Sequence, residues 1–154
     1  MPKSPRIFLD TSFIIAAVMS PAGGARLLFH LAQAGVIVLV VGPGVLQEAE
    51  EVLRRKAPYL MVTLAQLLDE INLEVREAPT AAENRQAGSL IDHRPDARVL
   101  AQALHAKPDW LASHDKAHFL GNPNLESLPF KIGSPGDVLV WLREKLNKIP
   151  VLSG

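Results

Sequence analysis

The stretch Arg6-Ile7-Phe8-Leu9-Asp10-Thr11-Ser12 decides the fold, because a short apolar run stops abruptly at an acid and two hydroxyls follow. Buried strands of parallel α/β sheets read as apolar runs, and ligand sites lie just beyond the carboxyl ends of such strands. Asp10 therefore stands where an α/β protein carries its chemistry.

A second apolar run ends in the same way, in Trp110-Leu111-Ala112-Ser113-His114-Asp115. If the two strand ends lie side by side, their acids form a carboxylate pocket. Oxygen ligands of this kind suit a hard divalent cation. The two runs together predict a cation site at one edge of a sheet.

Strand-like and helix-like segments alternate along the whole chain. The expected strands cover residues 7–9, 36–41, 73–75, 110–113 and 130–132, and the expected helices cover residues 12–19, 25–34, 45–56, 63–71, 80–90, 96–106 and 137–148. This alternation predicts an α/β protein, a three-layer α/β/α sandwich with a central mostly parallel sheet. Its crossover connections are expected to be right-handed.

Local signals set several helix ends. Gly35 is expected to close a helix, because glycine adopts the left-handed conformation found just past many helix ends. Thr63 and Gln66 have the spacing of a capping box, and so do Thr80 and Glu83. Each pair predicts the first turn of a helix.

Two prolines give further helix starts. Ser134-Pro135 reads as a cap followed by a proline at the first helical position. Pro95 is expected to start another helix with Arg94 extended before it, because a residue that precedes proline avoids the α region. Asp92 then belongs to a loop, and Asp96 lies in the first turn.

Composition bounds the class of protein. The chain has 154 residues, of which 48% are hydrophobic and 21% are charged, so a single domain over residues 1–154 is expected. The absence of cysteine excludes disulfides, thiolate zinc sites and a thiol nucleophile. Sixteen acids balance sixteen Lys and Arg, which removes bulk attraction to nucleic acid but permits a local patch.

Location follows from the same composition. The longest apolar stretch, Val36–Val41, is too short to cross a bilayer, and no signal peptide opens the chain. A cytoplasmic protein with no membrane partner is therefore expected.

Two more acids belong with the strand ends. Glu48 lies early in the helix after the second strand, and Asp96 opens a later helix. Because helices that follow parallel strands start at one sheet edge, we predict that Asp10, Glu48, Asp96 and Asp115 are both catalytic residues and metal ligands. Taken singly, these acids are explained as helix caps, dipole partners or solvated side chains. Taken together, they would repel one another, and a cation relieves that repulsion.

The chemistry of the donors selects the ion and the reaction. Oxygen-only ligands suit Mg²⁺ or Mn²⁺, and such ions assist phosphodiester hydrolysis. The hydroxyls of Ser12 and Ser113 would orient ligands or water. Arg98 and Lys116 are candidates for contact with substrate phosphates. The basic run Arg54-Arg55-Lys56 is better explained as a solvated helix end.

Other reaction classes lack their motifs. The chain has no GxGxxG after its first strand, no GxxxxGK[ST] and no GxSxG. Its five histidines form no HExxH pattern.

Four stretches in order resemble the motifs of the PIN domain family, which includes VapC-like toxins and other PIN-domain ribonucleases. They are Ile7-Phe8-Leu9-Asp10-Thr11-Ser12-Phe13-Ile14, the Val45–Leu53 helix with Glu48, the Asp96–Ala103 helix, and Leu111-Ala112-Ser113-His114-Asp115-Lys116. The resemblance runs from Arg6 to about Leu146. His114 departs from it mildly, since Gly or Arg is common there.

The resemblance implies a Mg²⁺- or Mn²⁺-dependent endoribonuclease that cuts single-stranded RNA, as the toxins of toxin–antitoxin pairs do. It also implies an antitoxin protein as a partner and a homodimer. Self-association is further expected from apolar residues near the early helices, Phe13, Leu27, Leu28 and Phe29, for which burial in the core of one domain is the open alternative. The alternatives are a catalytically weak PIN-fold module that binds RNA or a protein, and a phosphatase of unrelated mechanism.

Overall fold

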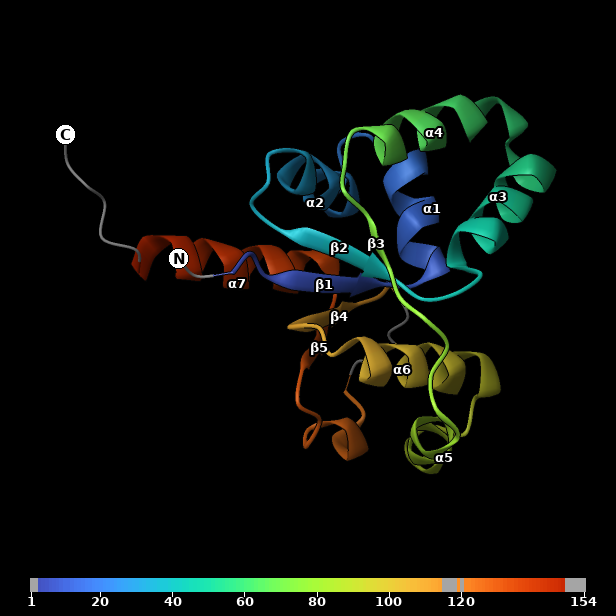
Figure 1. Cartoon of the computed structure of the whole chain (residues 1–154). Helices are drawn as coiled ribbons and strands as arrows, with labels where there is room; N and C mark the ends of the chain where they lie inside the picture. Colours follow the sequence, from blue (N-terminus) through green and yellow to red (C-terminus); the bar gives the residue numbers. More distant parts are fainter. Residues whose placement is uncertain (1–2, 115–118, 120, 149–154) are drawn as a thin grey trace.

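A five-stranded sheet forms the middle layer of the computed structural model, which describes residues 3–114, 119 and 121–148 (Figure 1). The strands are β1 (Arg6–Leu9), β2 (Val38–Val41), β3 (Glu74–Val75), β4 (Trp110–Ala112) and β5 (Lys131–Gly133). Their spatial order is β3-β2-β1-β4-β5, and each neighbouring pair is parallel. The predicted mostly parallel sheet is confirmed.

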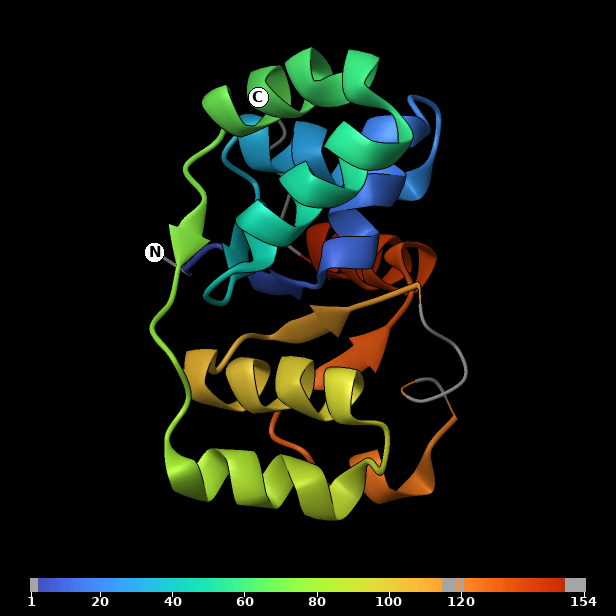
Figure 2. The same ribbon diagram turned by 90° about the vertical axis from the view of Figure 1, so that its right-hand side faces the viewer.

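Helices cover both faces of this sheet, which confirms the three-layer α/β/α prediction (Figure 2). The α-helices are α1 (Thr11–Met19), α2 (Gly24–Gln33), α3 (Val45–Lys56), α4 (Met61–Asp69), α5 (Ala81–Leu90), α6 (Arg94–Ala106) and α7 (Pro135–Lys148). Two 3₁₀ turns, η1 (Pro58–Leu60) and η2 (Pro123–Leu125), complete the set. Helices α1 to α4 lie on one face, and α5 and α6 lie on the other.

Each face buries its own apolar core, because side chains alternate between the two faces of a strand. Ile7 and Leu9 of β1 point toward the core that also holds Val138 and Leu142, so α7 packs on the same face as α1 and α2. Phe8 points to the other core, which α5 and α6 cover. The central strand is therefore buried on both sides, as its continuous apolar sequence predicted.

The register of β1 fixes the location of the strand ends. Leu9 pairs with Ala112 of β4, so Asp10 and Ser113 leave neighbouring strands at the same level. Both residues lie at the carboxyl edge of the sheet, where ligand sites of parallel α/β folds are found.

Several predicted helix ends are confirmed. Thr80 and Glu83 form a reciprocal capping box at the start of α5. Ser134 caps α7, since its hydroxyl accepts from the Asp137 amide at 3.2 Å. Gly35 has a φ of 79° and closes α2 as predicted.

The second strand starts later than predicted, at Val38 in place of Val36. The Val36 amide donates to the Leu31 carbonyl at 3.0 Å, and the Gly35 amide donates to the Ala32 carbonyl at 3.0 Å. These two bonds form the Schellman closure of α2, so Val36 belongs to the helix end.

Two predicted helix starts were wrong. Thr63 does not cap α4, because the η1 turn leads directly into a helix that begins at Met61 and has Leu60 in the cap position. Arg94 is not extended but is the first helical residue of α6, and His93 is the extended residue before it. Pro95 therefore takes the second helical position, where its missing N–H costs no intrahelical bond.

The apolar residues from which self-association was predicted are mostly core. Phe13, Leu28 and Phe29 are buried, and only Leu27 is exposed. In the described ranges no single helix is both long and apolar enough to cross a membrane, although α1 and α2, which meet at 94°, pass such a test of length and composition together.

Candidate active site

Asp10 is held rigidly at the end of β1. It caps α1, and its Oδ1 accepts from the Phe13 amide at 2.9 Å and from the Ser12 hydroxyl at 2.7 Å. Its Oδ2 accepts from the Ser113 hydroxyl at 2.7 Å. Asp10 is only 7% exposed, so three short bonds fix a buried carboxylate. The simpler explanation of Asp10 as a helix cap is therefore correct, and it is compatible with a functional role.

The two serines predicted to orient ligands bind different oxygens of this carboxylate. Ser12 comes from the first turn of α1, and Ser113 follows β4 and is fully buried. A carboxylate oxygen has two lone pairs, and Oδ1 uses both of its own. Among the bonds of the described residues, Oδ2 uses one, so one lone pair of Asp10 remains for a ligand.

Glu48 lies in the first turn of α3, as predicted. The turn before this helix has Gly44 at a φ of 78°, a conformation that favours glycine, and it directs the helix start over the sheet edge. The Thr11 hydroxyl donates to Glu48 Oε2 at 3.2 Å. Glu48 is exposed, and its carboxylate can turn toward a ligand when this surface bond breaks.

Asp96 is the third acid and lies in the first turn of α6. It is 9% exposed, and its Oδ2 is 2.8 Å from His93 Nδ1. The positive end of the α6 dipole favours a carboxylate at this position. Asp92, in contrast, is exposed and precedes the helix, as predicted.

One pocket of about 690 Å³ brings the three acids together. It is lined by Asp10, Thr11, Ser12, Pro43, Gly44, Val45, Glu48, Pro95, Asp96, Arg98, Val99, Gln102 and His114. Residues from four separate parts of the chain thus converge on one opening at the carboxyl edge of the sheet. Arg98 is exposed on its rim, where its guanidinium can meet an anion.

Two predicted site residues, Asp115 and Lys116, lie outside the described residues. Gln102 and His114 are among the lining residues that were not predicted as site residues. Gln102 lies seven residues after Pro95 and therefore shares a helix face with it, a spacing from which it could have been found. Its buried Oε1 has no hydrogen-bond partner in the described part of the chain.

Gly42 makes room for this glutamine. A Cβ at residue 42 would lie 2.1 Å from Gln102 Oε1, so any larger residue would force that side chain to move. The Gly42-Pro43-Gly44 turn therefore both shapes the pocket wall and starts α3.

The donor set fits a hard divalent cation by its chemistry. Asp10, Glu48 and Asp96 offer only oxygens to the pocket, and Mg²⁺ and Mn²⁺ prefer such ligands. Within residues 3–114, 119 and 121–148, no three Asp, Glu or His side chains already stand close enough to enclose an ion. To enclose an ion, the three acids would have to move closer together, and exposed Glu48 is the acid best able to do so.

Comparison with known proteins gives the family context. The model of the PIN domain family matches residues 6–117. The crystal structure of VapBC2 from Rickettsia felis, bound to a DNA fragment from their promoter, is similar at 16% identity and a TM-score of 0.60. The match covers 83% of this chain and 98% of that chain.

Two further structures are similar. PAE2754 from Pyrobaculum aerophilum matches at 16% identity and a TM-score of 0.53, over 91% of this chain and 90% of its own. VapC20 from Mycobacterium tuberculosis, described as a sarcin-ricin loop cleaving toxin, matches at 22% identity and a TM-score of 0.49, over 72% of this chain and 91% of its own. No curated protein sequence matches significantly. The structures from Rickettsia felis and Pyrobaculum aerophilum establish a shared fold.

Proposed function

Because this chain belongs to the PIN domain family, we propose that it is an endoribonuclease that hydrolyses phosphodiester bonds of single-stranded RNA with Mg²⁺ or Mn²⁺. The observation that supports this proposal most strongly is the pocket shared by Asp10, Glu48 and Asp96. Three carboxylates at one opening favour a cation, and a cation with a carboxylate cluster suits phosphoryl chemistry.

The residues of the pocket have distinct roles in this proposal. Asp10, Glu48 and Asp96 would hold the cation, with Asp115 as a fourth ligand. When bound, the cation supplies Lewis acidity, which offsets charge on the phosphodiester and activates water. Ser12 and Ser113 would hold the Asp10 carboxylate in place by donating to Oδ1 and Oδ2, respectively.

Basic side chains would bind the phosphates of the substrate. Arg98 is exposed beside Asp96 and can hold a phosphate through paired N–H donors. Lys116 is proposed for the same task from its place in the sequence.

A partner protein is proposed by analogy with the fold neighbours. The Rickettsia felis structure is a VapBC2 complex bound to promoter DNA. We therefore propose that this chain acts in the cytoplasm as the toxin of a toxin–antitoxin pair, with an antitoxin partner and a second copy of itself as a homodimer.

A substrate panel tests the proposal. Purified protein is incubated with labelled single-stranded RNA, the same sequence as duplex RNA, single-stranded DNA and a phosphomonoester, each with Mn²⁺ or with EDTA. We expect internal cleavage of single-stranded RNA that requires Mn²⁺. RNA binding without cleavage would indicate the catalytically weak binding module, and phosphomonoester turnover would indicate a phosphatase.

A further inference from the structure

Two tryptophans and two lysines form a cluster at the end of the sheet opposite the acidic pocket. The rings of Trp110 and Trp141 lie edge to face, with centroids 5.7 Å apart and an angle of 61°. Lys131 Nζ lies 5.9 Å from the Trp110 ring centroid and 6.0 Å from that of Trp141. Lys145 Nζ lies 4.7 Å from the Trp141 centroid. We name these four residues the Trp–Lys cluster.

The two rings differ in exposure. Trp110 is 7% exposed and packs beneath Gly133, where an added Cβ would come within 2.7 Å of the indole. Trp141 is half-buried, and both lysines are exposed. Trp110 therefore forms the buried base of the cluster, while Trp141 presents part of its ring to solvent beside two exposed positive charges.

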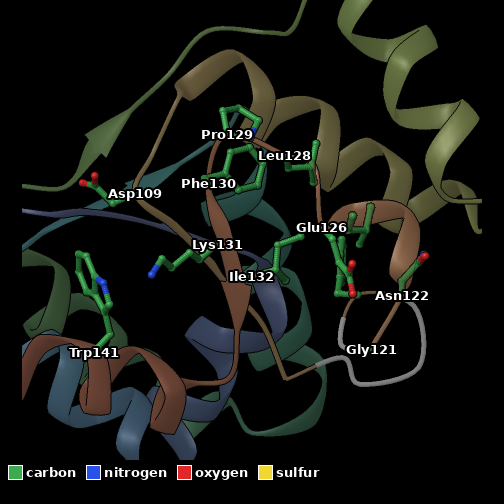
Figure 3. Close-up of a pocket in the computed structure, with 12 residues that line it drawn as sticks. Asp109, Gly121, Asn122, Glu126, Leu128, Pro129, Phe130, Lys131, Ile132 and Trp141 are labelled. Atoms are coloured by element: carbon green, nitrogen blue, oxygen red, sulfur yellow. The ribbon is translucent and has the colours of Figure 1, made fainter. Parts of the chain in front are cut away.

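A groove of about 530 Å³ runs from Trp141 along β5, which is an edge strand of the described sheet (Figure 3). Lys131 points toward Trp141 on one side of the strand, and Ile132 points toward Glu126 on the other. Phe130 and Leu125 contribute apolar side chains to the lining of the groove. The groove lies within the size range of small-ligand sites, about 300–1,000 Å³.

The groove has both acidic and basic side chains around it. Asp109 lines it, but its Oδ2 accepts from the Arg6 amide at 2.8 Å, so this acid is already engaged. Glu126 is exposed at the far end and can accept hydrogen bonds from base amino groups. The positive charge is concentrated at the ring of Trp141.

An aromatic face beside flexible cations is the chemistry with which proteins bind single-stranded nucleic acid. Bases stack on the ring, and lysines contact the backbone phosphates. Exposed cation–π contacts are weak, so the lysines can leave the ring when a base takes their place. With no net charge on the whole chain, such a local patch has to supply the attraction.

We propose that the Trp–Lys cluster is a second RNA-contact site, where a base of single-stranded RNA stacks on Trp141 while Lys131 and Lys145 bind the flanking phosphates. The choice of RNA rests on the proposed ribonuclease function. β4 leads from Trp110 to Ser113 in three residues, about 10 Å at about 3.3 Å per residue. Because β4 is buried between β1 and β5, one RNA strand that contacts both the cluster and Asp10 has to pass over the edge strand β5, a span of a few nucleotides.

The test uses intrinsic fluorescence, because the chain has only two tryptophans and both belong to the cluster. The full chain with Asp10→Asn, in EDTA, is titrated with a short single-stranded RNA, so that no cleavage occurs. We expect saturable quenching of the half-buried Trp141. Duplex RNA of the same sequence should not quench, because its bases are already stacked.

Charge and ring are then removed separately. Lys131→Ala/Lys145→Ala keeps both fluorophores, and the salt slope of its RNA affinity should fall by up to about 1.4, at about 0.7 for each lost phosphate contact. Trp141→Leu is measured with labelled RNA by anisotropy and should bind roughly 5- to 150-fold more weakly, the range for loss of one stacked base.

Two exposed residues elsewhere serve as matched controls. Tyr59→Ala removes an aromatic ring that is 77% exposed on η1, and Arg85→Ala removes an exposed cation on α5. Both should bind RNA as the parent does. Melting curves of all variants confirm that affinity is compared between folded proteins.

The proposal is overturned if RNA binds without quenching, if duplex RNA quenches equally, or if Trp141→Leu binds RNA as tightly as Tyr59→Ala. It is likewise overturned if an unstructured apolar peptide quenches and RNA does not, since the groove would then be a peptide site. Failure of the ribonuclease proposal looks different: quenching by RNA would persist while wild-type protein with Mn²⁺ cleaves nothing.

Discussion

The Ser113 hydroxyl donates to Asp10 Oδ2 at 2.7 Å, which joins two residues 103 positions apart in the chain. Both are buried, and they follow adjacent parallel strands. The bond therefore depends on the register of β1 and β4, and it restrains the carboxylate of Asp10, which lines the pocket. The same contact thus links the pairing of β1 with β4 to the position of Asp10, the candidate metal ligand.

We expect Ser113→Ala to lower the free energy of unfolding by about 1.5–3 kcal/mol, the usual contribution of one hydrogen bond to a charged group. RNA cleavage should fall further than stability alone explains, because Asp10 loses its orienting partner. Urea unfolding and initial cleavage rates measure the two effects. Ser89→Ala is the matched control, since its hydroxyl bonds the Gln86 carbonyl on the surface of α5. Equal cleavage rates in both variants would contradict an orienting role for Ser113.

Asp92 and Asp96 should respond differently to the same substitution. Asp96 lines the pocket from the first turn of α6, whereas Asp92 is exposed before the helix. Asp96→Asn should lose cleavage of single-stranded RNA at saturating Mn²⁺, and Asp92→Asn should retain it. The reverse result would show that the third ligand was assigned to the wrong acid.

The sequence predicted the fold well where a signal is local. The Thr80–Glu83 capping box and the Gly35 closure depend on neighbours within a turn, and the structure has both. Thr63 shows the limit of such signals: it has the spacing of a cap, yet the η1 turn leads into the helix before that residue. The η1 turn, and not Thr63, therefore determines where α4 begins.

The site was predictable in part for a related reason. Asp10, Glu48 and Asp96 follow from the rule that helix starts and strand ends share an edge, and one pocket holds all three. The helical spacing from Pro95 could have placed Gln102 on the pocket side of α6, but not the contact of its side chain with Gly42, which lies sixty positions away. Tertiary contacts of this kind leave no periodic trace in a sequence.

Divalent cations should stabilise the protein. A ligand that binds only the native state adds about 2.7 kcal/mol at a hundredfold excess over its Kd. For a chain of this size, that gain corresponds to a rise in Tm of roughly 5–11 °C. Thermal melts in EDTA, Mg²⁺ and Mn²⁺ measure the shift, with Glu48→Gln as the variant expected to reduce it. An unchanged Tm in either ion at millimolar concentration would argue against the cation site.

The contribution of Glu83, in the first turn of α5, to the free energy of unfolding should decrease at acidic pH. The pKa of Glu83 is lowered below its ordinary value of 4.5, first by the Thr80 amide that donates to its Oε1 at 2.8 Å and then by His105. A lowered pKa means that the stabilisation is complete above about pH 4.5 and is lost as the pH falls through the lower folded-state value.

Comparison of Glu83→Gln with wild type isolates this effect. The difference in unfolding free energy should be constant near neutral pH and should shrink below pH 4.5, as measured by urea unfolding at a series of pH values. Glu51→Gln, at an exposed position of α3, is the control. A difference that grows on acidification would show that the sign of the shift is wrong.

The central claim is that the carboxylate of Asp10 holds a divalent cation needed for RNA cleavage. The most direct measurement is the rate of single-stranded RNA cleavage against Mn²⁺ concentration, for wild type and for Asp10→Asn. Asparagine keeps the shape and can still cap α1, but it lacks the charge. We predict a saturable rise with Mn²⁺ for wild type and no cleavage at any concentration for Asp10→Asn. Equal rates for the two proteins, or wild-type cleavage that persists in EDTA, would contradict the account.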